Sequence, residues 1–181
     1  MTEEFVDIYD ENNNLLNISK TKNEAHKKGL WHRAVHIWIY TPKKELILQL
    51  RAKGKQIYPG LWDISAAGHV SAGEDSTVSA LREIEEEIGL KVRKEDLNFL
   101  KIKKIKGVYN DVRNNEFCYV YFLKYSGDIS KLKLQEEEVE EIRFISFDNF
   151  EKELKTNPEK YVPYAESWLE TIGEIKKRLN F

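Results

Sequence analysis

Four glutamates gather near the end of a helix predicted within residues 68–90, whose sequence is GHVSAGEDSTVSALREIEEEIGL: Glu83, Glu85, Glu86 and Glu87. The C-terminal end of a helix carries the negative end of its dipole, which disfavours each acidic side chain there by roughly 0.3–1 kcal/mol. At about 100° per residue, Glu83, Glu86 and Glu87 share one face of the helix, whereas Glu85 points away. A cation that prefers oxygen ligands, Mg²⁺ or alternatively Mn²⁺, would remove the repulsion among the three. A solvated acidic face is the alternative interpretation.

The helix that carries these acids has recognisable ends. It is predicted over residues 76–88, with Asp75 or Ser76 as its N-cap and Gly89 just after its last turn. Arg82 lies four residues before Glu86, so its guanidinium can hold the Glu86 carboxylate in place.

The spacing of the whole stretch, with Gly68, Glu74 and then REIEEEIGL over residues 82–90, resembles the signature of the Nudix hydrolases at every fixed position. The resemblance implies an α/β/α sandwich around a mixed sheet. It also implies that Glu83, Glu86 and Glu87 bind Mg²⁺, together with the backbone carbonyl of Gly68. The arginine at position 82 then orients one of these carboxylates.

Motifs outside this stretch resemble one branch of that family, which contains type I isopentenyl-diphosphate isomerases and their hydrolase relatives. They are HRAVH at 32–36, LQLR at 48–51, PGLW at 59–62 and NEFC at 115–118. The isomerases carry a catalytic cysteine where this chain has Ala67, and an alanine cannot transfer the proton that isomerisation requires. The single cysteine, Cys118, lies elsewhere in the pattern, so a hydrolase is favoured over an isomerase.

The branch resemblance also implies a second metal site built from histidines. The residues that match it are His26, His36 and His69 with Glu116, whereas Asn114 stands where a further glutamate would be. The second site is therefore predicted to be weakened or lost. From its own context, His36 is predicted to be a buried strand residue and His26 a surface residue. Glu116 is either an acid at the start of a strand or a catalytic base.

Basic residues should complete the binding of an anionic substrate. Arg51 and Lys55 match positions that hold diphosphate in the isomerases, and Lys22 and His69 are further candidates for substrate binding. Solvated side chains at a sheet edge are the alternative for the arginine and lysines.

The predicted reaction is hydrolysis of a diphosphate bond in a small organic diphosphate, either a nucleoside diphosphate derivative or an isoprenoid diphosphate. The metal would activate a water molecule, and Glu87 or Glu116 would take its proton, so the predicted catalytic residues are Arg82, Glu86, Glu87 and Glu116. An isomerase-like enzyme and a non-catalytic, nucleotide-sensing module are the alternatives.

Strands and helices alternate irregularly along the chain, which predicts an α+β fold with a mixed sheet packed between helices. Strands are expected at 5–9, 34–40, 45–51, 64–70, 99–109, 117–125 and 140–146, and helices at 22–28, 76–88, 147–155 and 158–179. We expect a single domain over 1–181 with a core at about 30–150. The N-terminal hairpin and short helix at 5–29 and the C-terminal helix at 158–179 would be added to that core.

Composition narrows the class of protein. A chain of 181 residues suits one domain, and a net charge of −2 favours neither a nucleic-acid partner nor a membrane. One cysteine allows no internal disulfide, and the acidic N-terminus is unlike a signal peptide. These features predict a cytoplasmic protein with a small-molecule substrate, and they are compatible with a homodimer.

Overall fold

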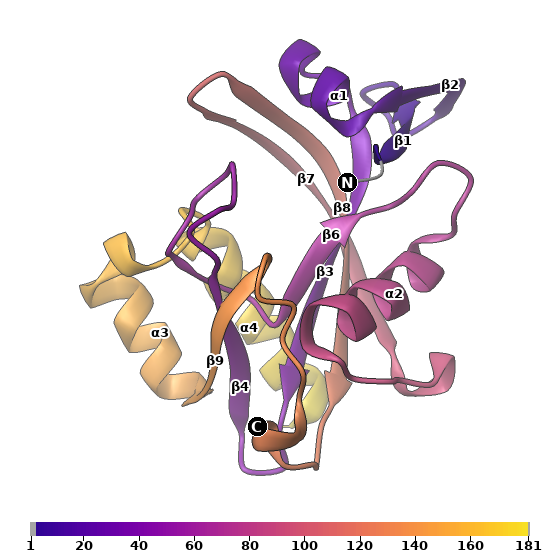
Figure 1. The fold of residues 1–181 in the computed structure, drawn as a ribbon. Coiled ribbons are helices and arrows are strands. Elements are labelled where there is room, and N and C mark those ends of the chain that lie inside the picture. Colours follow the sequence, from indigo (N-terminus) through magenta and orange to yellow (C-terminus); the bar gives the residue numbers. More distant parts are fainter. Residues whose placement is uncertain (1–2, 181) are drawn as a thin grey trace.

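A seven-stranded mixed sheet forms the centre of the protein, in a computed structural model that describes residues 3–180. The strand order is β5-β4-β3-β8-β7, with β6 paired to β3 and β9 paired to β4, and a separate hairpin joins β1 to β2 (Figure 1). The strands are β1 (Phe5–Tyr9), β2 (Leu15–Thr21), β3 (His32–Tyr40), β4 (Glu45–Arg51), β5 (Trp62–Asp63), β6 (Ala66–His69), β7 (Asn98–Tyr109), β8 (Val112–Lys124) and β9 (Val139–Ser146). The α-helices are α1 (Lys22–Lys28), α2 (Ser76–Ile88), α3 (Phe147–Thr156) and α4 (Ala165–Leu179).

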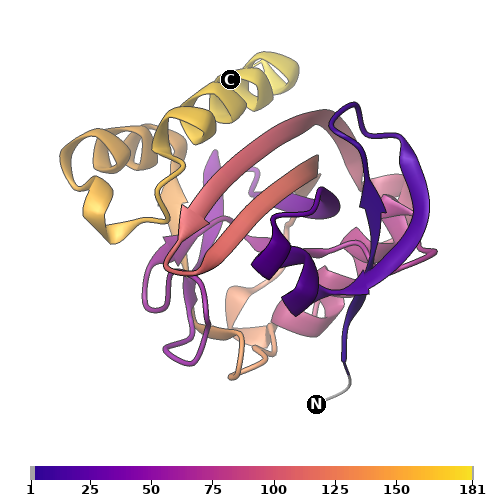
Figure 2. The same cartoon turned by 90° about the horizontal axis from the view of Figure 1, so that it is seen from above.

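Helices cover both faces of the sheet because the residues of its strands are apolar on both sides. Val35 and Ile37 of β3 pack with Ile84 of α2, whereas Trp38 packs with α3 and α4 through residues such as Phe150 and Trp168. Figures 1 and 2 show α2 on one side of the sheet and the α3–α4 pair on the other. The arrangement confirms the predicted α+β fold with a mixed sheet between helices.

On one edge, the central strand β3 pairs with two different strands in turn. On one side it pairs in parallel with β8 over its whole length. On the other side β6 pairs with residues 34–37, whereas β4 meets β3 at the Tyr40–Leu46 pair. The two strands β4 and β6 therefore diverge next to β3, and this divergence matters for the site described below.

Helix α2 begins and ends where the sequence predicts. The Asp75 carboxylate accepts a hydrogen bond from the backbone N–H of Thr77, which caps the N-terminus. Gly89 ends the helix in the left-handed conformation with φ 68°, which a glycine adopts at little cost.

Two predicted boundaries are wrong. The helix expected from residue 158 is a 3₁₀ turn over Pro158–Lys160, and α4 begins only at Ala165. Pro163 lies between them, and its ring and missing N–H interrupt a helix. Strand β8 begins at Val112 rather than 117, because a two-residue turn with Asn110 at φ 52° pairs it with β7 directly. Within the described residues, none of the helices has the length and apolarity that a membrane span requires.

Candidate active site

Helix α2 lies so close to β6 that the Glu83 carboxylate covers the backbone of Gly68. A Cβ placed on Gly68 would lie 2.0 Å from the carboxyl carbon of Glu83, which is far inside van der Waals contact. Glycine at this position thus creates the space in which a carboxylate and a main-chain segment meet. This is the first place where the structure brings predicted site residues together.

Glu87 lies at the point where β4 and β6 diverge. Its Oε2 accepts a 3.1 Å hydrogen bond from the Gln49 side chain of β4 and another of 3.1 Å from the backbone N–H of Ala67 in β6. The side chain is buried, with 4% of the residue exposed. One carboxylate thus bridges the opening between two strands, and the hydrogen bonds leave its other oxygen for further contacts.

Arg82 connects the carboxylates of α2 to each other and to the segment after β6. Its guanidinium donates to Glu83 Oε1 at 2.7 Å and to Glu86 Oε2 at 3.1 Å, and also to the backbone carbonyl of His69 at 3.1 Å. The Glu86 side chain is 53% exposed. By contrast, the exposed side chain of Glu85 pairs not with Arg82 but with Lys91, at 3.3 Å. The predicted separation of three acids from the fourth agrees with these contacts.

Burial changes the ionisation of the two inner glutamates. It raises the pKa of Glu83 to about 7, although the neighbouring Arg82 opposes the rise. For Glu87, burial and then the charge of Glu83 raise the pKa to about 8, against opposing contributions that include Lys55 and the hydrogen bond from Ala67. In the absence of a cation, the carboxyl group of Glu87 therefore retains its proton at neutral pH.

We expect the metal-free protein to lose stability as the pH rises through this range. The pKa of Glu87 is about 4.5 in an unfolded chain and about 8 in the fold, so the folded state binds the proton more tightly. Its stabilising contribution is complete below about pH 4.5 and is lost as the pH rises through about 8. The measurement is urea unfolding in EDTA from pH 5 to 9, with Glu87→Gln as the control that removes this titration. A wild-type free energy of unfolding that rises with pH relative to the variant would contradict the assignment.

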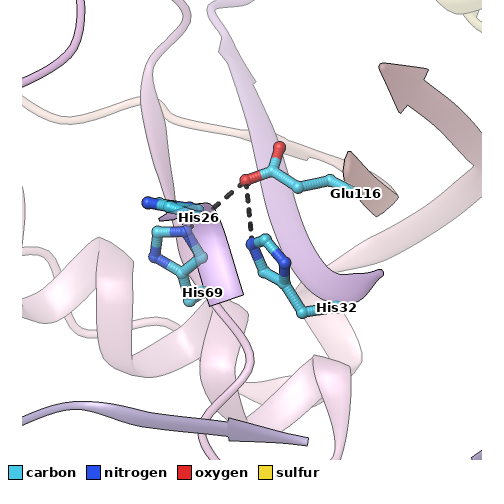
Figure 3. A group of neighbouring side chains, drawn as sticks. All are labelled: His26, His32, His69 and Glu116. Atoms are coloured by element: carbon cyan, nitrogen blue, oxygen red, sulfur yellow. Dashed lines mark ion pairs between the residues drawn. The ribbon is translucent and has the colours of Figure 1, made fainter. Parts of the chain in front are cut away.

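A second group of side chains lies on the opposite side of β6: His26, His32, His69 and Glu116 (Figure 3). One potential ligand atom from each residue lies within 4.8 Å of all the others. Glu116 Oε1 is 3.4 Å from His69 Nε2 and 3.6 Å from His32 Nε2. We call these four residues the histidine cluster.

Strand register brings the histidine cluster together. In the parallel β3–β8 pair, His32 lies directly beside Glu116. In the β3–β6 pair, His69 lies beside Ala34, which follows His32 on the same face of β3. Residue His26 comes from the last turn of α1. Strand pairing and the end of α1 therefore bring together residues that are far apart in the sequence.

The histidine cluster has the chemistry of a metal site. His32 Nδ1 donates to the backbone carbonyl of Leu30 at 2.9 Å, so that in the neutral imidazole Nε2 carries the lone pair that can bind a metal. The Nε2 atoms of His26, His32 and His69 are buried without a hydrogen-bond partner. Burial would raise the pKa of Glu116, but the contacts with His32 and His69 outweigh it and hold that pKa well below its usual value. Three imidazoles and one carboxylate suit a transition-metal ion.

Two predictions about the histidines are wrong. The structure places His32, not His36, with the other two, because His36 lies further along β3 beside Glu116 and Cys118. His26 is buried with 5% exposed rather than on the surface. Glu116 is also no edge acid, since it is buried inside β8 between β3 and β7. Asn114 Oδ1 is buried without a hydrogen-bond partner among the described residues, and the weakening or loss of the second site stays a prediction.

The basic residues predicted to bind substrate already have acidic partners. Arg51 contacts Asp63 at 2.8 Å and also donates to backbone carbonyls of residues 57 and 58. Lys55 pairs with Glu138, and Lys22 pairs with Glu4 at 2.6 Å. Only His69 of the four predicted substrate-binding residues lies in the histidine cluster. Their role in binding stays a prediction, and it requires these pairs to open or to include the substrate.

Three residues of the site were not predicted from the sequence: Gln49, His32 and Glu4. Gln49 is a fully buried amide in an otherwise apolar strand, and that polar interruption of ELILQLR was a usable signal. His32 is the first residue of the HRAVH motif, which bears on the prediction only as part of the family resemblance. Glu4, which lies 3.6 Å from His69 Nδ1, precedes the first strand and had no local signal.

Comparisons with known proteins identify similar chains. The model of the NUDIX domain family matches residues 30–166. Nudix hydrolase 3 of Arabidopsis thaliana is 38% identical over 169 residues, which cover 91% of this chain but 22% of that protein, so the chain spans about a fifth of that relative. An uncharacterized Nudix hydrolase of Clostridium acetobutylicum is 36% identical, with 77% and 68% of the two chains covered. The isopentenyl-diphosphate delta-isomerase of Serratia proteamaculans is 28% identical, with 86% and 84% covered.

Solved structures show the same fold. A crystal structure of a Deinococcus radiodurans protein superimposes with a TM-score of 0.66 at 15% identity, and it covers 85% of this chain and 90% of its own. At that identity the likeness concerns the fold alone.

Proposed function

Because this chain belongs to the Nudix hydrolase family, we propose that it is a Mg²⁺-dependent enzyme that cleaves the diphosphate bond of a small organic diphosphate. The observation that carries the proposal is the packing of α2 on β6. Glu83 covers Gly68, Arg82 fixes Glu83 and Glu86, and Glu87 reaches into the opening between β4 and β6. The substrate is either a nucleoside diphosphate derivative or an isoprenoid diphosphate.

The proposed metal ligands are Glu83, Glu86, Glu87 and the backbone carbonyl of Gly68. Two observations support their fit to a divalent cation: a cradle at Gly68 that a Cβ would fill, and a donor set made only of oxygens. When bound, Mg²⁺ neutralises phosphate oxygens and lowers the pKa of a water molecule. The chain's own contribution is to hold these carboxylates at fixed positions, because Arg82 and Gln49 restrain three of them.

A carboxylate must also accept the proton of the attacking water, and we propose two candidates for this role. Glu87 accepts both of its hydrogen bonds on Oε2, which leaves Oε1 for a water molecule. Glu116 is kept ionised by the neighbouring His32 and His69. Either residue acts as general base in this proposal, and Arg82 serves to orient the acids rather than to transfer protons.

The isomerase is the strongest alternative, because a relative carries that name. Isomerisation moves a proton between carbons and therefore needs an acid and a base beside the carbon skeleton. At the position of the isomerase cysteine, Ala67 offers only a methyl group, and its N–H is already bonded to Glu87. A non-catalytic sensing module is less well supported, since all three acidic residues of the predicted metal site are present.

The proposed function predicts Mg²⁺-dependent phosphate or monophosphate release from one class of diphosphate. The panel is isopentenyl diphosphate, nucleoside di- and triphosphates, nucleotide sugars and dinucleotides, each assayed with Mg²⁺ and with EDTA. Product NMR on isopentenyl diphosphate distinguishes hydrolysis from double-bond migration. Double-bond migration without phosphate release would establish the isomerase instead. If no assay detects a product and calorimetry detects no metal binding, the protein is the non-catalytic module.

A further inference from the structure

A cavity of about 570 Å³ opens beside the histidine cluster. Its walls come from three segments that are distant in the sequence: helix α1, the turn between β7 and β8, and the loop after β4. The lining residues that matter here are Asn23, His26, Lys27, Gln56, Asn110 and Arg113. Figure 2 shows α1 lying next to the β7–β8 hairpin, so that the two form neighbouring walls.

Two cations on these walls have no anionic partner. Among residues 3–180, the side chains of Lys27 and Arg113 make no hydrogen bond or ion pair, unlike Arg51, Lys55 and Lys22. Asp111 also lines the cavity and offsets only one of the two charges. The cavity thus keeps an excess of positive charge that no group of the described chain neutralises.

The position of Arg113 is fixed by packing at the end of α1. Gly29 ends this helix at φ 62°, and a Cβ placed on it would lie 3.2 Å from Cβ of Arg113. The Asn115 amide donates to the Gly29 carbonyl at 2.7 Å, which fastens the end of α1 to β8. The first carbon of the Arg113 side chain therefore lies against the end of α1, and the residue as a whole is exposed, so its guanidinium is accessible to a ligand.

His26 belongs both to the lining of this cavity and to the candidate active site. This residue lines the cavity and also belongs to the histidine cluster, where its ring centroid is 5.1 Å from that of His32 and 5.2 Å from that of His69. His69 directly follows Gly68, over which the Glu83 carboxylate lies. The cavity therefore borders the histidine cluster, and the proposal below requires a substrate that reaches from the carboxylates of α2 past this cluster.

The chemistry of the walls selects the kind of group that fits. The amides of Asn23, Gln56 and Asn110 offer hydrogen-bond donors and acceptors. The apolar members of the described lining are two valines of the β7–β8 hairpin, and it includes no aromatic ring for stacking a base. Arginine presents a planar fork of donors that matches a phosphate, and lysine adds a point charge. A prenyl chain would leave these polar and charged groups without partners, at a cost in binding.

We propose that this cavity is a specificity subsite for a second phosphate group, carried by the part of the substrate that is not cleaved, with Lys27 and Arg113 as its cationic donors. The inference rests on the proposed function and narrows it: the substrate is an organic diphosphate that bears a further phosphate at its far end. Lys27 and Arg113 are specificity-determining residues and take no part in bond cleavage.

The test uses two pairs of diphosphates that differ only by one distant phosphate: NADP⁺ against NAD⁺, and coenzyme A against dephospho-coenzyme A. Calorimetry in EDTA measures each Kd with hydrolysis suppressed. The member with the extra phosphate should bind at least about 10-fold more tightly, since a charge-assisted bidentate contact contributes that much. Arg113→Gln and Lys27→Gln should each reduce the preference to about 3-fold or less and leave the other member's Kd unchanged within about twofold.

Two matched variants control for a general loss of positive charge. Lys28→Gln removes the neighbouring lysine of α1, which pairs with Glu24 at 2.6 Å and does not line the cavity. Arg93→Gln removes an exposed arginine that pairs with Asp96 at 2.8 Å. Neither should change the preference between the members of a pair.

The outcomes separate this inference from the proposed function. Hydrolysis of either pair with Mg²⁺, combined with equal Kd values in both pairs, overturns the subsite and leaves the hydrolase intact. A clear preference that Arg113→Gln abolishes supports the subsite even where Mg²⁺ produces no cleavage, which would count against the hydrolase alone. No binding of any of the four compounds overturns the subsite.

Discussion

Glu86→Gln is expected to lower kcat for Mg²⁺-dependent diphosphate hydrolysis by about 100-fold or more while the protein remains folded. Glutamine keeps the shape of the side chain but removes the negative charge that would bind the cation, and losing one preorganised electrostatic contact of this kind has an effect of that size. The side chain is half exposed, and its ion pair with Arg82 is one of several that this arginine makes. Exposed pairs contribute little to stability, so thermal unfolding should change by only a few degrees.

Glu85→Gln is the matched control for this result. It removes the same charge from the adjacent residue of the same helix turn, but Glu85 points away and pairs with Lys91. Its kcat should stay within about twofold of wild type, because surface substitutions outside a site have small effects. If the two variants behave alike, the acids of α2 act only through total charge and the proposed metal ligands are wrong.

Gly68→Ala is expected to abolish most activity for a steric reason. The new methyl carbon would lie 2.0 Å from the carboxyl carbon and 2.3 Å from both oxygens of Glu83. The Glu83 side chain must therefore leave its place, and it could then no longer bind the proposed cation together with the backbone carbonyl at position 68. Since a misplacement of about 1 Å can reduce a rate by about 100-fold, we expect kcat/KM to fall by at least that factor.

Circular dichroism and steady-state kinetics on purified Gly68→Ala measure the effect. Gly54→Ala is the control, because a Cβ on Gly54 meets no atom within 4 Å and the backbone there is not in the left-handed region. Near-normal activity of Gly68→Ala would mean that the close approach of Glu83 to the strand is dispensable, and it would remove the main support for the proposed site. A variant that fails to fold would instead be examined as Gly68→Ala combined with Glu83→Asp, whose shorter side chain restores the space.

The helical part of the site was predictable because it depends on local geometry. Spacing along one helix determines which carboxylates share a face, and Gly89 and Asp75 mark the helix ends in the sequence itself. The separate behaviour of Glu85 follows from the same periodicity. The burial of Glu87 cannot be predicted from this periodicity, because it depends on how β4 and β6 diverge.

The histidine cluster required information that the sequence does not display. Whether His32 or His36 joins His26 and His69 depends on how α1 and β6 lie against β3, and both residues lie on the same face of β3. Period-two alternation cannot distinguish them. The acidic partners of Arg51 and Lys55 are Asp63 of β5 and Glu138 just before β9, and tertiary packing brings them together. The basic character of the two residues therefore predicts substrate binding but does not reveal these ion pairs.

The parallel pairing of β3 with β8 also bears on the order of events during synthesis. His26, His32 and His69 are all translated long before Glu116, which reaches them only when β8 inserts beside β3. Pairings between distant parts of a chain form slowly, because the connecting segment loses freedom before the contact stabilises it. A nascent chain therefore presents three imidazoles without the carboxylate that completes their group. The complete group of four side chains therefore forms only after β8 has been translated and has paired with β3.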